Sequence, residues 1–151
     1  MSLVRDFPDL PPVWMLGHGF AAWAASRVVP VLSFEGPTAR FLGGLAVGAG
    51  IALSVWAAYW FLRERTTIEP RERPTALIFE GPFRLNRNPI YTGMALVLLG
   101  FALWLGTLAA LAVVALFPVV IDRRFVPGEE AMLRESFGDS AAAYIASTRR
   151  W

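Results

Sequence analysis

The stretch FLGGLAVGAGIALSVWAAYWFL, residues 41–62, decides the fold class because it contains no charged side chain. At about 1.5 Å per residue, a helix of this length crosses a hydrocarbon core of about 30 Å. Trp56 and Trp60 near its end suit the aromatic belt at a membrane–water interface. Its glycines permit close helix packing, and Gly44 and Gly48 have the small-xxx-small spacing. We therefore expect a membrane-spanning helix here.

Three further apolar segments flank this helix, at residues 13–34, 90–105 and 107–121. The first contains Pro30 and is expected to be a second spanning helix with a kink near its end. The other two are short for a full span, which takes about 20 residues, and little more than Gly106 separates them. We expect a tight helical hairpin. The predicted fold is an all-α integral membrane protein with two spanning helices, this hairpin and a cytoplasmic C-terminal helical tail.

Two polar regions remain, residues 63–88 and 122–151, and they contain most of the arginines. Two spans and a hairpin place both regions on one side of the membrane, and the arginine bias makes that side cytoplasmic, with both termini. The tail is expected to be helical from about Gly128, with Gly138 separating two short helices. The length predicts one domain, residues 1–151, in which residues 1–62 supply two transmembrane helices and residues 63–151 the functional site.

The composition excludes several kinds of chemistry. The chain has 151 residues, of which 56 % are hydrophobic, against about 45–50 % in soluble domains. It has no cysteine and a single histidine, His18, so we expect no metal site. Every basic residue is arginine, which removes lysine chemistry, and the net charge of +2 predicts no nucleic-acid partner. The first twelve residues lack the pattern of a cleavable signal peptide.

The stretch GPFRLNRNPIYTG, residues 81–93, stands at the polar start of the third apolar segment. Arg84 and Arg87 are three residues apart, and in a helical or tight turn they would project together. Two guanidinium groups make a clamp for a carboxylate or a phosphate. The alternative is that they are orientation signals and headgroup anchors, as arginines beside membrane helices usually are.

The second half of this stretch has the features of a ligand-binding helix start. Pro89 restrains Asn88 and can be the first residue of a helix, whose free amides favour an anion. Tyr91 supplies a phenol in the first turn. Gly93 removes bulk where a ligand or another helix must come close.

A second candidate cluster comprises Glu129, Glu130 and Tyr144 in the tail. Acidic residues in a first helical turn favour the helix dipole, which is the structural explanation for one of the two carboxylates. Adjacent residues point about 100° apart on a helix, so one carboxylate can face solvent while the other faces a site.

The two clusters together resemble the isoprenylcysteine carboxyl methyltransferase family and the related phospholipid methyltransferases. The resemblance rests on GPFRLNRNPIYTG, on the hairpin, on EEAMLRESFGDSAAAYIASTRRW at residues 129–151, and on a run-in from Thr67 to Pro70. It implies a bacterial inner-membrane enzyme that uses S-adenosylmethionine. Asn88 stands where the family often has histidine. An amide can hold a ligand but cannot take up a proton at neutral pH.

The resemblance implies a cofactor pocket at the cytoplasmic end of the hairpin. Arg84 or Arg87 would hold a carboxylate in the catalytic site, and Glu129 or Glu130 the ribose or amino group. The other cofactor-binding residues would be Asn88, Pro89, Tyr91, Gly93 and Tyr144.

The implied reaction is in-line methyl transfer to a lipophilic acceptor, such as the carboxylate of an isoprenylated or lipid substrate. The acceptor would enter from the bilayer between the second span and the hairpin. The main alternative is a non-catalytic membrane subunit that binds lipid or a partner protein. A small exporter would want an acidic residue inside the membrane, and the four apolar segments contain none.

Overall fold

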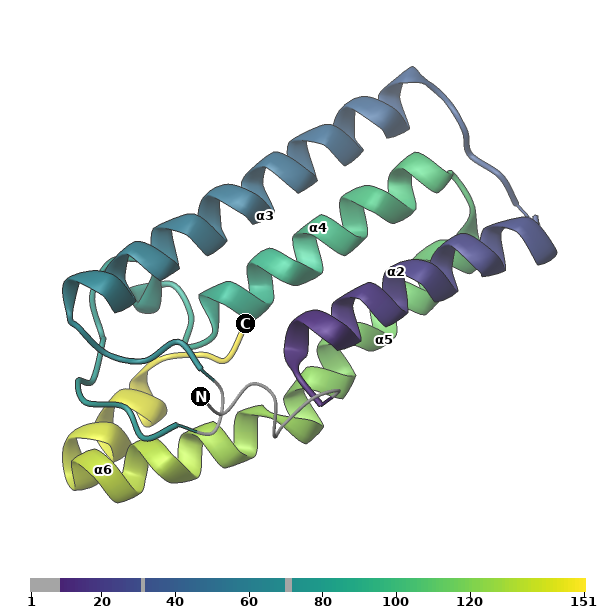
Figure 1. Ribbon diagram of the computed structural model, residues 1–151. Coiled ribbons are helices and arrows are strands. Elements are labelled where there is room, and N and C mark those ends of the chain that lie inside the picture. Colours follow the sequence, from purple (N-terminus) through teal and green to yellow (C-terminus); the bar gives the residue numbers. More distant parts are fainter. Residues whose placement is uncertain (1–8, 31, 70–71) are drawn as a thin grey trace.

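The computed structural model describes residues 9–30, 32–69 and 72–151, and over these ranges the chain is helical with no β-strand (Figure 1). The expected all-α class is confirmed. Part of the signal-peptide prediction, residues 1–8, and Pro70 of the run-in lie outside the described residues. The helices are α2 (Pro11–Val28), α3 (Pro37–Arg63), η1 (Gly81–Arg84), α4 (Pro89–Leu105), α5 (Leu108–Arg124) and α6 (Val126–Ser147).

Helix α3 corresponds to the stretch that decides the fold class. Among the described helices it is the one that is long and apolar enough to cross a membrane. Large apolar side chains along it are exposed, among them Leu45 at 55 % and Val55 at 63 %. Such exposure is unlike that of a core helix in a soluble protein, whose apolar side chains are mostly buried.

Helix α2 differs from the expected kinked span. It ends at Val28 rather than at residue 34, and Val29 has φ −127° and ψ 74°, outside the helical region. The reason is Pro30, whose ring disfavours the helical conformation of the residue before it. The chain therefore leaves the helix instead of bending it. Of the two expected N-terminal spanning helices, α3 alone meets the criterion of length and composition.

Helices α4 and α5 form the expected tight hairpin. Gly106 has a φ of +64°, a left-handed conformation that ends α4 and favours glycine. The side chain of Thr107 then caps α5 by accepting a hydrogen bond from the backbone amide of Ala110 at 3.2 Å. The link before α3 joins this turn, because the amide of Phe34 donates to the carbonyl of Gly106 at 2.8 Å.

Helices α3 and α4 approach each other closely through glycines. A Cβ on Gly43 would lie 2.8 Å from the carbonyl oxygen of Gly100, and a Cβ on Gly50 would lie 2.5 Å from that of Gly93. Residues seven apart share a helix face, so each helix presents two glycines to the other. Gly93 therefore serves helix packing, one of the two roles expected for it.

The predicted pair Gly44 and Gly48 does not contact another helix. A Cβ on either residue would meet nothing within 4 Å. Both residues are exposed, because their positions are rotated away from the face that α3 presents to α4. The small-xxx-small spacing was present, but the packing uses the glycines on either side of it.

The two polar regions meet at one end of the helices. Helix α6 and the loop before η1 lie side by side there, beside the start of α2 and the end of α3 (Figure 1). Gly138 has non-helical angles, φ 54° and ψ −128°, inside α6, which confirms that it separates two shorter helices. The residues that carry the candidate chemistry thus come from both regions and share one end of the molecule.

Candidate functional site

A pocket of about 410 Å³ occupies this end, between the start of α2, the end of α3, the start of α4, the loop before η1, and α6. Its volume falls within the range of about 300–1,000 Å³ that is common for small-molecule sites. Most of the predicted site residues line it, namely Arg87, Asn88, Pro89, Tyr91, Glu129, Glu130 and Tyr144. The pocket brings together the two clusters that the sequence singled out.

Arg84 does not join Arg87 in a clamp. Residues 81–84 form a short 3-10 helix that ends before Arg87, so the two side chains are not on adjacent turns of one helix. Arg84 is exposed and lines a separate hollow with Phe79, Glu80 and Gly81. Of the two predicted arginines, Arg87 lines the pocket and Arg84 does not, so the structure does not bring them together there.

Arg87 is buried in a network that closes around Glu130. Its Nη2 donates to Glu130 Oε1 at 2.8 Å, and only 10 % of the Arg87 side chain and 8 % of the Glu130 side chain are exposed. Its Nη1 donates to the backbone carbonyls of Ile145 and Thr148. Arg150 holds the same carboxylate, with Nε donating to Oε1 at 2.8 Å and Nη2 to Oε2 at 3.0 Å.

The two arginines fix the charge of Glu130. Hydrogen bonds from Arg150 lower the pKa of this carboxyl below its usual range, burial opposes the shift, and Arg87 adds to the lowering. Glu130 therefore remains ionised at neutral pH, and both of its oxygens have donors. Glu130 thus acts as the structural counter-ion of Arg87 and Arg150 at the wall of the pocket.

Glu129 also turns inward and lines the pocket. The hydroxyl of Tyr91, a buried side chain on α4, donates to Glu129 Oε1. Burial raises the pKa of Glu129, the hydrogen bond from Tyr91 opposes the shift, and the nearby charge of Glu130 adds to the increase. The expectation that one of the two acidic residues faces solvent is not met, because both line the pocket.

Comparison with known proteins assigns the family. The phospholipid methyltransferase family model matches residues 38–140, more than half of the chain. The chain belongs to the phospholipid methyltransferase family. An uncharacterized protein of Haemophilus influenzae is 37 % identical over 62 residues, which make up 41 % of this chain and 98 % of that protein. No solved structure matches the chain.

Membership of the phospholipid methyltransferase family implies methyl transfer to a lipid-type substrate by a membrane-associated protein. The matched residues include α3, the hairpin and both candidate clusters as far as residue 140. Most of the pocket described above therefore lies within the part of the chain that the family model matches. The lining residues outside that part are residues 10–12 and Tyr144.

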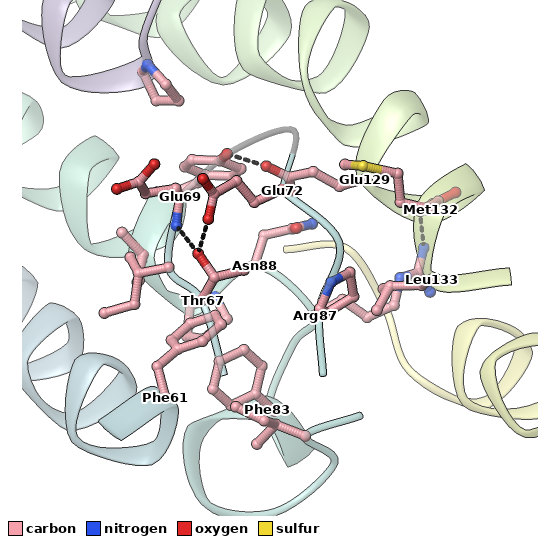
Figure 2. A pocket seen from close by; sticks show the side chains of 18 of the residues that line it. Phe61, Thr67, Glu69, Glu72, Phe83, Arg87, Asn88, Glu129, Met132 and Leu133 are labelled. Carbon is pink, nitrogen blue, oxygen red and sulfur yellow. Dashed lines mark hydrogen bonds and ion pairs between the residues drawn. The ribbon is translucent and has the colours of Figure 1, made fainter. Parts of the chain in front are cut away.

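Several residues that line the pocket are not singled out by the sequence interpretation. Figure 2 shows Glu69 and Glu72 on the same side of the pocket as Glu129, with the hydroxyl of Thr67 donating to Glu72 Oε2 at 3.0 Å. No periodicity relates these loop acids to a helix that begins more than fifty residues later, so the sequence gives no signal that they meet Glu129. Within the described residues, no group of three or more His, Cys, Asp or Glu is placed to hold a metal ion.

Aromatic side chains form the other side of the pocket. Phe61 at the end of α3 and Phe83 in η1 meet edge to face, with ring centroids 5.4 Å apart and an angle of 83° (Figure 2). This contact joins α3 to the motif that carries Arg87. Phe83 lies within the stretch at residues 81–93, but an apolar residue beside an apolar segment gives no signal in the sequence that it lines a pocket.

Tyr144 supports Phe83 rather than facing a ligand with its hydroxyl. Its hydroxyl donates to the backbone carbonyl of Phe83 at 2.9 Å, and the side chain is buried. Burial raises the pKa of Tyr144 to about 12, with the charge of Arg87 opposing the shift. The phenol therefore remains a hydrogen-bond donor throughout the physiological range.

Replacing Tyr144 by phenylalanine is expected to destabilise the protein by about 1–3 kcal/mol, because the buried carbonyl of Phe83 loses its donor. Thermal unfolding of the purified protein in detergent measures the change. Tyr59→Phe is the matched control, because Tyr59 is 57 % exposed. Equal unfolding midpoints for the two variants would contradict the supporting role of Tyr144.

Proposed function

We propose that the pocket binds S-adenosylmethionine and that the protein transfers its methyl group to a lipophilic acceptor. The observation that carries the proposal is the meeting of residues 87–91 with Glu129 and Glu130 in one pocket at the polar end of apolar helices. The family assignment supports methyl transfer to a lipid-type substrate. When bound, S-adenosylmethionine supplies an electrophilic methyl group on a sulfonium.

The residues of the pocket fit the charges of this cofactor. Arg87 Nε is buried and has no hydrogen-bond partner among the described residues, which leaves it as a donor for the cofactor's carboxylate. Glu129 offers an acceptor for an ammonium or hydroxyl group, and Asn88 also lines the pocket. Phe61 and Phe83 provide an apolar surface for an aromatic base. We assign Glu130 to holding Arg87 rather than to the cofactor.

Glu129 is also the group best suited to hold a proton. Asn88 cannot do so, whereas the raised pKa of Glu129 brings this carboxyl closer to neutral pH than an ordinary glutamate. This property favours an acceptor that has a proton to lose, such as an amine or a hydroxyl. A carboxylate acceptor, which the resemblance suggested, would have no need of it.

The acceptor's route differs from the one expected from the sequence. Contacts between the glycines of α3 and α4 leave no room for a lipid chain between them. The pocket wall includes residues 10–12 at the start of α2 and Phe61 of α3, with Ile90 and Met94 of α4 between these elements. We propose that the apolar part of the acceptor approaches between α2 and α3, along α4, with α3 crossing a bacterial inner membrane and both termini cytoplasmic.

The test is binding of S-adenosylmethionine by the detergent-solubilised protein, measured by titration calorimetry. Saturable binding is expected, and Glu129→Gln is expected to weaken it about tenfold or more, since a hydrogen bond to a charged group contributes about 1.5–3 kcal/mol. Glu135→Gln is the control, because Glu135 pairs with Arg73 at an exposed position.

Two outcomes would decide against the proposal in different ways. If neither S-adenosylmethionine nor its demethylated product binds, the cofactor assignment fails. If the cofactor binds but no methylated lipid forms when membranes are supplied with labelled cofactor, the non-catalytic membrane subunit becomes the better explanation.

A further inference from the structure

The chain beyond α6 turns back and lies along the motif that lines the pocket. We call residues 148–151 the strap. The backbone amide of Arg87 donates to the carbonyl of Arg149 at 2.9 Å, and the side-chain amide of Asn88 donates to the carbonyl of Arg150 at 3.2 Å. The carbonyl of Thr148 accepts from Arg87 Nη1. Three consecutive carbonyls of the strap therefore hold two adjacent residues of the pocket.

The last two residues of the strap are themselves held by other parts of the molecule. Trp151 packs against the apolar core formed by α2, α4 and α5. Arg150 extends between α5 and α6, where Nη1 lies 3.2 and 3.3 Å from the two oxygens of Asp122, while Nε and Nη2 hold Glu130. The pKa of Arg150 is raised, chiefly by its hydrogen bonds to Glu130.

Glu130 connects Arg150 to the pocket. Its Oε1 accepts from Arg150 and from Arg87, each at 2.8 Å, so one oxygen sets the relative position of the two guanidinium groups. Arg134 also faces this carboxylate, but at 3.9 Å and from a side chain that is 50 % exposed. Removal of Arg150 would leave Glu130 free to rotate toward Arg134, and Arg87 would lose its fixed partner.

We propose that Arg150 is a positioning residue for the methyl-transfer site, which holds Glu130 and, through Glu130, orients Arg87 toward the ligand. The inference rests on the proposed function. It concerns a part of the chain beyond the residues 38–140 that match the family model. Arg150 does not line the pocket, so its effect on a ligand has to pass through Glu130 and the strap.

The experiment measures the dissociation constant for S-adenosylmethionine by calorimetry on the full chain in detergent, with thermal unfolding in parallel. Arg150→Ala is expected to raise the dissociation constant about tenfold, the effect of about 1.4 kcal/mol. Arg134→Ala removes a guanidinium charge from the exposed side of Glu130. This variant is expected to change the dissociation constant by no more than about twofold. Arg150→Lys keeps the charge and serves where the alanine variant does not fold.

A double-mutant cycle separates positioning from general stabilisation. If Arg150 acts through Glu130, Arg150→Ala will have little further effect on affinity in a Glu130→Gln background. Unchanged affinity in both Arg150 variants, or fully additive effects in the cycle, would overturn the inference while leaving the proposed function intact. Absence of cofactor binding by the unaltered protein would instead refute the proposed function, and this inference with it.

Discussion

Replacing Gly50 by leucine is expected to destabilise the protein by at least about 3 kcal/mol, or to prevent folding. A Cβ at this position would lie 2.5 Å from the carbonyl oxygen of Gly93 and 2.9 Å from Val97 Cγ2. The nearest obstacle is backbone, so a change of rotamer cannot relieve it, and overpacking of a filled interface costs about 1–3 kcal/mol or more. For a chain of this size that corresponds to a fall of roughly 6–12 °C in the unfolding midpoint.

The control for this prediction is Gly48→Leu on the same helix. A Cβ on Gly48 would meet nothing within 4 Å, and the residue is exposed. Both variants add the same side chain to α3, so helix propensity and apolarity change equally. A Gly48 variant as unstable as the Gly50 variant would show that the cost comes from the helix itself rather than from its contact with α4.

The helices could be predicted from sequence because their signals are local. The turn at Gly106 and the break at Gly138 each depend on a few adjacent residues, and both are confirmed. The apolar runs are also helical, although the run from residue 13 to residue 34 ends its helix at Val28. The end of α2 was also within reach, because Pro30 disfavours helix at Val29. The sequence does not predict which glycines of α3 face α4. Because α3 is apolar on all sides, no polar face marks the side that is turned away from its partner.

The set of residues that line the pocket was largely predictable from the sequence, but the hydrogen bonds and ion pairs among them were not. Resemblance brought Arg87 and Glu130 together as ligand-binding residues, whereas the structure pairs them with each other. The pairing depends on Arg150, whose guanidinium reaches Glu130 from a position twenty residues later. Two arginines at the end of a chain look like solvated charge, and no helical or strand periodicity relates them to residues 87 and 88.

Replacing Glu130 by alanine is expected to destabilise the protein by about 3–5 kcal/mol and to weaken cofactor binding. The change leaves the guanidinium of Arg87, only 10 % exposed, without its carboxylate, and breaking a buried ion pair from one side has a cost of this size. Arg150 is 37 % exposed and retains Asp122, so most of the loss comes from Arg87. Thermal unfolding in detergent measures the stability.

Glu135→Ala is the matched control. Glu135 is on the same helix, and both side chains of its ion pair with Arg73 are exposed, so the change in stability is expected to be no more than about 1 kcal/mol.

The stabilities of the two variants are also expected to respond differently to low pH. The pKa of Glu130 in the folded protein lies below its ordinary value of 4.5, so its stabilisation is complete above about pH 4.5 and is lost as the pH falls through the folded pKa. The Glu130 variant should therefore lose less stability on acidification than the Glu135 variant. Equal unfolding midpoints at neutral pH would mean that the network around Glu130 does not hold the two polar regions together.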